Sequence, residues 1–171
     1  MIRRAKMGDG PGIHVAHMES ICEVCAPFYT PEEIMAWGGR EYNSKKWDQA
    51  ITEHYVWIVE VNGKIEGHAH LKIIQDVGLG IVEEESNFGK CGYIGSFYLT
   101  KNILGKSYGK YLMEEIFKIA KVEKIHLLTC EATINARPFY KKMGFVEVGG
   151  EKKVEVNGVL VRCYPMKYDL K

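Results

Sequence analysis

The fold is decided by Asn135-Ala-Arg-Pro-Phe-Tyr140-Lys-Lys-Met-Gly-Phe145, which follows the apolar run Ile125-His-Leu-Leu-Thr-Cys130-Glu-Ala132. The apolar run has the length and composition of a buried strand. Asn135 can cap a helix after it, and Pro138 falls in the first turn, where no backbone donor is needed. Gly144 can end this helix. The pattern therefore predicts a strand and then a short helix that carries Tyr140 within two turns of its start.

The phenol of Tyr140 is a candidate proton donor. A tyrosine with its ordinary pKa of ~10 can protonate a leaving thiolate, and the short helix can turn this side chain toward a ligand beside the strand. An aromatic residue on a short helix also commonly packs in the core. The sequence leaves both roles open for Tyr140.

A second motif, Gly105-Lys-Ser-Tyr-Gly109-Lys110, stands between a strand-like run at 92–99 and an amphipathic helix. Apolar residues recur at helical spacing from Tyr108 to Ala120, and charged residues occupy the other face of the helix. A strand, a glycine loop and a helix in this order present backbone N–H groups to a phosphate. Two glycines before a helix are equally compatible with a simple tight turn.

The two motifs occur in the order and with the spacing found in the GNAT acetyltransferase superfamily, which the chain resembles over nearly its whole length. Residues 135–145 resemble the signature N-A-x-x-F-Y-x-K-x-G-F, and residues 97–113 resemble a strand that runs into R/Q-x-x-G-x-G/A and a helix. Leu104 stands where the family prefers Arg or Gln, and Ser107 replaces the middle glycine, whereas Gly109 keeps the last one. Because backbone amides do most of the anion binding, we expect coenzyme A binding to survive these changes.

The resemblance implies acetyl-CoA as the co-substrate and direct transfer of its acetyl group to a primary amine within a ternary complex. The implied cofactor contacts are Phe97, Tyr98, Leu99, Leu104, Gly105, Lys106, Ser107, Tyr108, Gly109, Lys110, Asn135 and Tyr140. A backbone N–H from the strand around 97–99 would stabilise the negative charge that grows on the carbonyl oxygen. Tyr140 would act as general acid toward the sulfur.

An ammonium group cannot attack a thioester, so the reaction also needs a base or an ordered water. His68 and His70 point to the same face of one predicted strand, and in this family that strand lies beside the acceptor pocket. Glu131, Tyr93 and Tyr98 are alternative bases. The two imidazoles are equally compatible with solvated or hydrogen-bonded structural roles.

The acceptor itself is not specified by the sequence. Tyr29 and Trp37 lie in a segment that resembles the helices on the acceptor side of small GNAT proteins, and Tyr93 is a third candidate substrate contact. An aminoglycoside, a polyamine, an amino acid, a peptide N-terminus or a protein lysine would each fit the fold. A non-catalytic acyl-CoA-binding or regulatory module is the alternative function, and the departures at Leu104 and Ser107 favour it.

Local signals place the remaining elements. We expect an edge strand at 2–6, a helix face formed by Met18, Ile21, Cys22, Cys25 and Phe28, a capping box at Thr30-Pro-Glu-Glu33, and a short helix from Ser44 that buries Trp47, Ala50 and Ile51. Asn62-Gly63 and Asn157-Gly158 each predict a type I′ hairpin turn, and 75–90 is predicted to be a long loop. The predicted fold is α/β of the α+β type, a single domain at 1–171 whose mixed, mostly antiparallel sheet is flanked by helices.

Composition limits the partners. The chain has 171 residues, and 23 Lys plus Arg against 22 Asp plus Glu give a net charge of +1, so nothing electrostatic favours a nucleic acid. No apolar span reaches membrane length, so we expect a cytoplasmic protein without a membrane partner; a homodimer stays open. Cys22-Glu-Val-Cys25 has the spacing of half a zinc site, but no second pair exists, so we expect no metal and five reduced, packed thiols.

Overall fold

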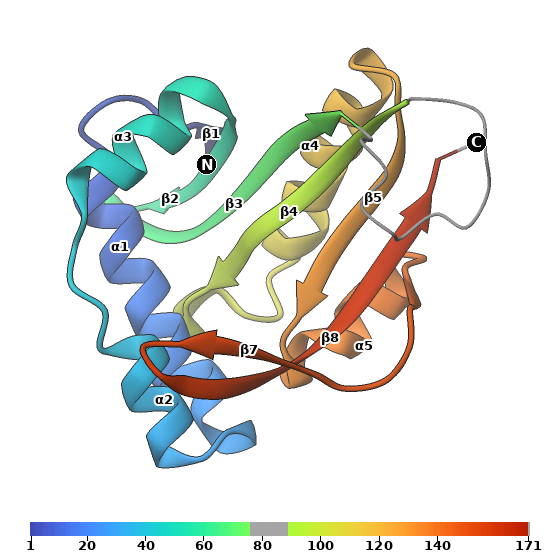
Figure 1. Cartoon of the computed structure of the whole chain (residues 1–171). Helices are drawn as coiled ribbons and strands as arrows, with labels where there is room; N and C mark the ends of the chain where they lie inside the picture. Colours follow the sequence, from blue (N-terminus) through green and yellow to red (C-terminus); the bar gives the residue numbers. More distant parts are fainter. Residues whose placement is uncertain (76–88, 171) are drawn as a thin grey trace.

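The computed structural model describes residues 1–75 and 89–170, which form a mixed sheet with helices on both faces (Figure 1). The strands are β1 (Ile2–Arg4), β2 (Tyr55–Val61), β3 (Lys64–Gln75), β4 (Lys90–Leu99), β5 (Ile125–Ala132), β6 (Val146–Glu147), β7 (Lys152–Val156) and β8 (Val159–Asp169). Their order is β1-β2-β3-β4-β5-β8-β6, and β7 pairs with β8. Only β4 and β5 are parallel among these pairs, which confirms the predicted mixed, mostly antiparallel sheet.

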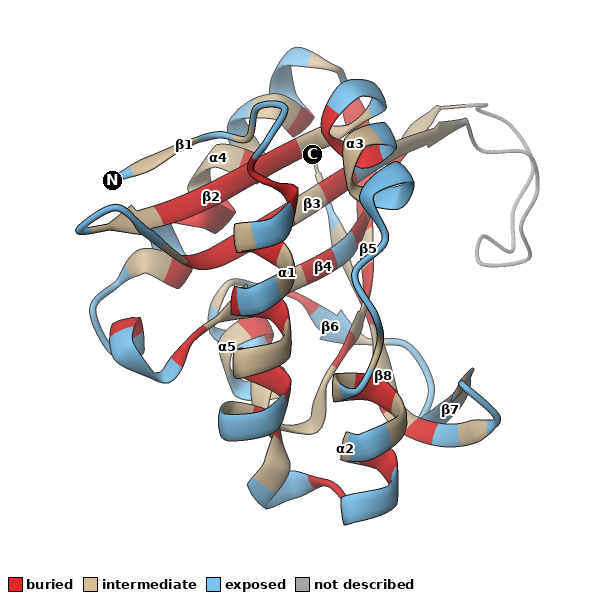
Figure 2. Cartoon of the chain, turned by 90° about the vertical axis from the view of Figure 1, so that its left-hand side faces the viewer, coloured by how far each residue is buried: buried red, intermediate tan, exposed pale blue. Residues whose placement is uncertain are grey.

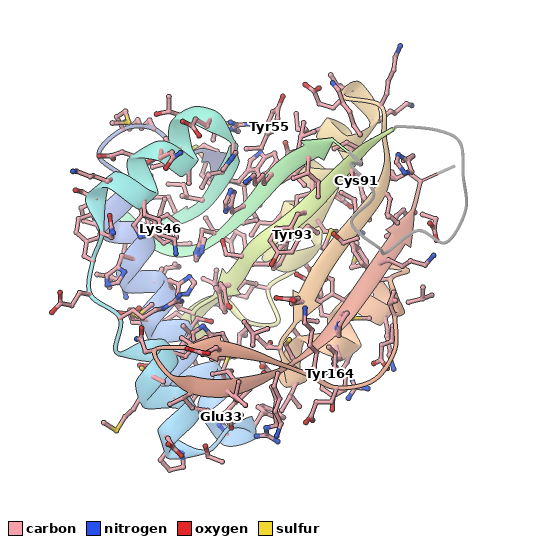
Figure 3. All side chains as sticks on the ribbon, in the orientation of Figure 1. Glu33, Lys46, Tyr55, Cys91, Tyr93 and Tyr164 are labelled. Atoms are coloured by element: carbon pink, nitrogen blue, oxygen red, sulfur yellow. The ribbon has the colours of Figure 1, made fainter. Side chains whose placement is uncertain are left out.

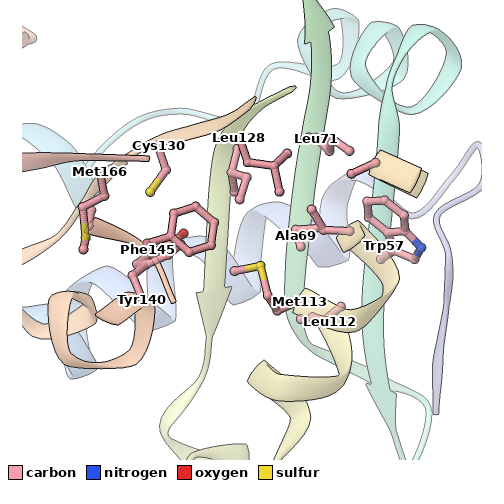
Figure 4. Packing of buried hydrophobic residues seen from close by; sticks show 14 of the residues in the cluster. Trp57, Ala69, Leu71, Leu112, Met113, Leu128, Cys130, Tyr140, Phe145 and Met166 are labelled. Atoms are coloured by element: carbon pink, nitrogen blue, oxygen red, sulfur yellow. The ribbon is translucent and has the colours of Figure 1, made fainter. Parts of the chain in front are cut away.

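The helices divide between the two faces of the sheet. They are α1 (Gly10–Glu19), α2 (Pro31–Gly38), α3 (Ser44–Glu53), α4 (Tyr108–Val122) and α5 (Arg137–Lys142). Successive side chains of a strand point to opposite faces, and β2 follows this rule. Val56 and Ile58 pack against α1 and α3, whereas Trp57 packs against α4 on the other face (Figure 4). The middle of β2 is therefore buried on both sides, as Figure 2 shows.

An irregularity in β4 opens the sheet near its centre. The pairing of β4 with β3 shifts between His70↔Ser96 and Leu71↔Ile94, which leaves Gly95 as an extra residue. The pairing of β4 with β5 ends at the same level, at Ile94↔Cys130. Beyond this point the two parallel strands diverge toward their carboxyl ends (Figure 1). A β-bulge bends its strand and disrupts the ladder locally. Residues 96–99 stay paired with β3, but on the side of β5 their backbone groups face an opening.

The local signals of the sequence are mostly confirmed. The side chain of Thr30 accepts from the Glu33 backbone N–H, and the Glu33 carboxylate accepts from the Thr30 N–H, which completes the capping box. Asn62 has φ of 51° and Gly63 has φ of 77°, as a type I′ turn requires. Asn157 and Gly158 repeat this geometry with φ of 49° and 79°. For the predicted loop at 75–90, Gln75 ends β3 and Lys90 begins β4, and 76–88 lie outside the described residues.

The first helix is longer than the predicted face, and the predicted cap of α5 is wrong. The first helix begins at Gly10, eight residues before the predicted face, and continues as a π-helical segment, Ser20–Cys25. Of the predicted face, Ile21 and Cys25 are buried, whereas Cys22 is exposed and Phe28, in the 3₁₀ turn Ala26–Phe28 that follows, is exposed as well. Asn135 does not cap α5, since a 3₁₀ turn at Ile134–Ala136 comes first and the helix begins at Arg137.

Candidate active site

A groove of about 400 Å³ lies between the first helical segment, the end of β4, the start of α4 and the start of α5; we call it the α4 groove. Residues predicted to bind the cofactor make much of its wall: Phe97, Tyr98, Leu99, Leu104, Gly105, Ser107, Gly109, Lys110 and Asn135. The residues that sequence reasoning missed come from the π-helical segment, from the turn after β5, and from α5 and its C-terminal end: Ser20, Val24, Cys25, Thr133, Ala136, Phe139, Lys142 and Met143. Lys106 and Tyr108 lie outside the wall, because Lys106 is exposed and Tyr108 packs against the core.

One end of the α4 groove is built for an anion. Gly105 and Ser107 have φ of 74° and 63°, and this turn aims the first N–H groups of α4 at the groove. The first turn of α4 contains no acidic residue, so the positive end of the helix dipole is not neutralised there. Lys110 and Lys142 add two ammonium groups to the wall. The arrangement suits a phosphate or pyrophosphate group.

The other end of the α4 groove is apolar except for one amide. Phe97 and Phe139 are in contact, with ring centroids 5.3 Å apart. A Cβ on Gly109 would lie 3.2 Å from the Phe139 ring, so glycine allows the helix start to approach this pair. Asn135 Oδ1 is buried in the wall and has no hydrogen-bond partner within the described part of the chain. A buried, unpaired carbonyl oxygen is costly, and a ligand N–H would satisfy it.

A narrow passage of about 140 Å³ continues from the groove into the opening between β4 and β5. Tyr93, Glu131, Tyr140 and Cys163 are four of its wall residues. The Glu131 carboxylate is partly exposed and lies 2.8 Å from the Lys152 ammonium group. Burial raises the pKa of Tyr93 to about 12 and that of Cys163 to about 11, so both side chains are protonated at neutral pH. Glu131 is therefore the carboxylate on the wall of the passage, and it is ion-paired with Lys152.

Tyr140 closes the passage from the side of α5. Its ring is 4% exposed and lies against Phe97, Phe139 and Phe145, so the residue is also part of the core (Figure 4). Burial raises the pKa of the Tyr140 phenol well above its ordinary value, and the hydroxyl hydrogen-bonds to Cys130. The phenol therefore carries its proton at every ordinary pH. Tyr140 faces the passage and does not line the α4 groove.

On the far side of the passage is a cavity of about 420 Å³ between α1, α2, α3 and the face of β3 and β4; we call it the α1–α3 cavity. Tyr98 belongs to the walls of all three spaces, and Gly95 and Ser96 belong to both the passage and the cavity. A Cβ on Gly95 would lie 3.3 Å from both His70 Nδ1 and the Tyr93 ring. Glycine at this bulge thus keeps the connection open. The groove, the passage and the cavity therefore adjoin one another around Tyr98.

The acetyltransferase (GNAT) domain profile matches residues 25–170 of this sequence. The chain belongs to the GNAT acetyltransferase family. An uncharacterised N-acetyltransferase of Escherichia coli K12, YafP, is 20% identical over 98% of this chain and 94% of its own length. A GCN5-related N-acetyltransferase from Rhodopseudomonas palustris has the same fold, with a TM-score of 0.81 and 22% identity over 99% of this chain and 95% of that one. The PaiA N-acetyltransferase of Thermoplasma acidophilum, solved with coenzyme A, gives a TM-score of 0.74 and 20% identity over 99% and 98% of the two chains.

The α4 groove fits the coenzyme of a GNAT protein. Its helix start and two lysines match a pyrophosphate, its apolar end matches a pantetheine chain, and Asn135 Oδ1 matches an amide N–H. Neither Leu104 nor Ser107 blocks the groove. Leu104 is 44% exposed on its rim, and Ser107 adopts the left-handed conformation that explains why glycine is preferred at this position.

His68 does not fit the predicted role of general base in this GNAT protein. Its side chain is fully buried beneath α1 and α3, because these helices cover the face of β3 that the sequence suggested was half solvated. Burial lowers the pKa of His68 to about 3. His68 Nε2 lies 3.3 Å from His17 Nδ1, and His17 Nε2 lies 3.0 Å from an Arg40 nitrogen.

These contacts fix the tautomers of both rings. A guanidinium only donates, so His17 Nε2 accepts from Arg40 and His17 Nδ1 carries the proton. His17 Nδ1 therefore donates to His68 Nε2, and His68 Nδ1 holds a buried proton with no partner in the described structure. His68 has no lone pair directed at the cavity. Its position supports a structural role.

His70 lines the α1–α3 cavity, but it is a weak base. Its Nε2 is 2.9 Å from His54 Nδ1, and burial, followed by the charge of His54, lowers the pKa of His70 to about 4. Tyr98 does not serve as a base at neutral pH, because burial raises the pKa of its phenol well above the ordinary value and the hydroxyl keeps its proton.

Tyr29 and Trp37 differ in position. The Tyr29 hydroxyl donates to the Arg162 carbonyl at 2.9 Å and accepts from the Ile134 N–H at 3.0 Å, so its hydrogen bonds are internal. Tyr29 belongs to the core cluster of the π-helical segment and α2, which argues against a contact with the acceptor. Trp37 lines both the passage and the α1–α3 cavity.

None of the helices in residues 1–75 and 89–170 is both long and apolar enough to cross a membrane. All five cysteines are described and none forms a disulfide; no group of three or more His, Cys, Asp or Glu side chains within 1–75 and 89–170 is placed to hold a metal ion.

Proposed function

We propose that this GNAT protein transfers the acetyl group of acetyl-CoA directly to a primary amine. The observation that supports this proposal is that the α4 groove, the passage and the α1–α3 cavity share wall residues around Tyr98. A thioester lying along the groove and an amine entering from the cavity would meet in the opening between β4 and β5. Holding two reactants in one geometry is a large part of the catalysis of such reactions.

The chain would hold the cofactor mainly through backbone groups. The N–H groups at the start of α4, with Lys110 and Lys142, would bind the pyrophosphate, and Asn135 Oδ1 would accept from an amide of the pantetheine. The bound cofactor supplies an activated thioester carbonyl. Backbone N–H groups of β4 beyond the bulge at Gly95 have no β5 partner and would stabilise the charge on the carbonyl oxygen.

Two protons leave the acceptor ammonium during the reaction. Glu131 would take the first, directly or through a water, because it is the carboxylate on the wall of the passage. The amine nitrogen then forms the C–N bond as the C–S bond breaks. Tyr140 would donate its proton to the departing sulfur, and the second proton of the amine restores the phenol by way of solvent or the base. The products are an N-acetylated amine and the thiol of coenzyme A.

Thermal melting with acetyl-CoA tests the cofactor site. A ligand that binds only the folded chain adds about 2.7 kcal/mol at a hundred times its Kd, which raises the Tm by about 5–10 °C at this chain length. Absence of a shift at millimolar acetyl-CoA would overturn the proposal. Release of free coenzyme A with a panel of amines then separates the enzyme from the non-catalytic binding module, which would show the Tm shift without turnover.

A further inference from the structure

The α1–α3 cavity carries an excess of positive charge. Arg40, Lys46 and Lys72 stand on its wall, and Glu41 is the carboxylate among its wall residues. Within 1–75 and 89–170, none of the three cations has a carboxylate oxygen within 4.0 Å. Most surface lysines pair or extend into water at little cost. Three cations on the wall of one cavity, without an ion pair to any described residue, are different, because like charges in a shared space repel one another.

Arg40 is the best ordered of the three cations. Its Nε donates to the Trp37 carbonyl at 3.0 Å, and one Nη2 proton goes to His17 Nε2 at 3.0 Å. These two contacts fix the plane of the guanidinium, and within the described residues no hydrogen bond engages its Nη1 group. A guanidinium edge matches the two oxygens of a carboxylate or phosphate.

The other two cations come from different elements. Lys46 is on α3, which lies over the face of the sheet that carries α1 (Figure 3), and Lys72 is on β3. Burial is the largest cause of the lowered pKa of His70, followed by the neighbouring His54 and then by the charges of Lys72 and Lys46. The pKa of His17 is lowered mainly by burial and by His68, and the charges of Arg40 and Lys46 lower it further. The imidazoles are thus neutral, and the positive field in the cavity comes from the three side chains.

An independent sign of a ligand comes from Ser96. Its side chain is 9% exposed, lies on the wall shared by the cavity and the passage, and has an Oγ without a hydrogen-bond partner in the described structure. A buried unpaired hydroxyl is unfavourable. A polar ligand group at the mouth of the passage would satisfy it. Trp37, Trp47 and Tyr98 give the cavity an aromatic lining between Ser96 and the cations.

We propose that the acceptor is a small molecule that carries both the reacting amine and an anionic group, a carboxylate or a phosphate, and that Arg40, Lys46 and Lys72 bind the anionic group in the α1–α3 cavity. This inference rests on the proposed acetyl transfer. The volume of about 420 Å³ suits a small metabolite. The cations also lower the pKa of the bound ammonium group and so raise the fraction of reactive amine. Polyamines and aminoglycosides, which carry several positive charges, are repelled.

The experiment compares matched amines in an assay of coenzyme A release. One set keeps a four-carbon chain: 4-aminobutanoate, 4-aminobutanamide and 1,4-diaminobutane. A second set is phenylalanine, phenylalaninamide and 2-phenylethylamine, and a third is O-phosphoethanolamine with ethanolamine. The remaining amino acids and a tetrapeptide with a free N-terminus complete the panel. We expect kcat/KM of the best anionic amine to exceed that of its partner with an uncharged group in place of the anion at least tenfold, and to fall as ionic strength rises.

The double variant Lys46→Gln/Lys72→Gln links the preference to the cavity. Neither side chain has a hydrogen-bond or ion-pair partner in the part of the chain that the structure describes, so the fold is spared. We expect kcat/KM of the best anionic amine to fall at least tenfold, and to fall much more than that of the matched amine without the anionic group. Lys45→Gln, one residue along α3 and outside the wall, is the matched control and should change neither. Lys46→Glu should shift the preference toward 1,4-diaminobutane.

The outcomes separate this inference from the proposed function. Loss of the acetyl-CoA Tm shift would refute both. Turnover that favours neutral or dicationic amines, or the tetrapeptide, would leave acetyl transfer standing and overturn the anionic acceptor. A bound acetyl-CoA without turnover of any anionic amine would also overturn it. An equal loss with Lys45→Gln would show that the effect is one of overall charge and not of the cavity.

Discussion

A negative charge at Ser107 should raise the stability of the folded chain and weaken its binding of acetyl-CoA. Its φ of 63° places a non-glycine residue in the left-handed region directly before α4. Asp and Asn tolerate this conformation better than other residues with a side chain. Ser107→Asn and Ser107→Asp therefore leave the turn intact, and they differ from each other by one negative charge at the start of the helix.

The magnitudes follow from the two electrostatic environments. Without ligand, a carboxylate at the N-terminus of α4, whose first turn lacks acidic residues, contributes about 0.3–1 kcal/mol to stability. With ligand, the same carboxylate would lie roughly 5 Å from a pyrophosphate; with an effective dielectric constant of ~40, each phosphate charge costs about 1.7 kcal/mol. Two such charges amount to about 3 kcal/mol, or roughly a hundredfold weaker binding.

We therefore expect Ser107→Asp to have a Tm equal to or above that of the wild type in the absence of ligand, and a Kd for acetyl-CoA between tenfold and a hundredfold higher. Ser107→Asn should bind within about threefold of the wild type. Differential scanning calorimetry gives the first quantity, and isothermal titration at low salt gives the second. If the Asp and Asn variants bind acetyl-CoA equally well, the pyrophosphate does not lie at the start of α4.

Three further outcomes test the chemistry, the passage and the fold. Tyr140→Phe keeps the ring contacts, so kcat should fall by roughly a hundredfold with KM for acetyl-CoA little changed, and a normal kcat would remove the residue from the mechanism. Gly95→Ala narrows the passage and should lower kcat/KM for the amine while leaving the Kd of acetyl-CoA, measured by calorimetry, unaltered. The hydrogen bond from Arg162 lowers the pKa of Glu33 to about 2, so this carboxylate stabilises the fold above pH ~4.5 and the contribution disappears as the pH falls toward 2. Melting curves of Glu33→Gln should lose that acid dependence, and those of Glu32→Gln, on the exposed side of α2, should keep it.

The parts of the fold that depend on neighbouring residues were predictable. The capping box at Thr30, the two Asn-Gly turns and the glycine loop before α4 each form from groups a few residues apart. The start of α1 at Gly10 was not predicted, because Asp9 makes no side-chain capping bond and the segment has little amphipathic pattern. Asn135 is a residue type that commonly caps helices, yet it does not cap α5 and instead lies in the wall of the α4 groove.

The site was predictable where one segment forms it and not where several converge. The motif residues of β4 and α4 could be assigned to the cofactor because they are consecutive. Arg40, Lys46 and Lys72 look like ordinary surface residues in the sequence, and only the packing of α2 and α3 over β3 brings them to one cavity. His68 shows the converse, since its alternation with apolar residues indicates a half-exposed strand face that two helices in fact cover.

The number of residues in the π-helical segment at 20–25 sets how the helical residues that line the α1–α3 cavity are rotated relative to those that line the α4 groove. Each residue turns an α-helix by about 100°, so removing one residue here would rotate α1 by that angle relative to the end of the segment. At present His17 faces the α1–α3 cavity while Val24 and Cys25 face the α4 groove, and the Ser20 hydroxyl donates to the Leu99 carbonyl at 3.0 Å. A single-residue deletion in this segment would misalign one wall or the other, whereas the same deletion in an exposed loop would leave both in place.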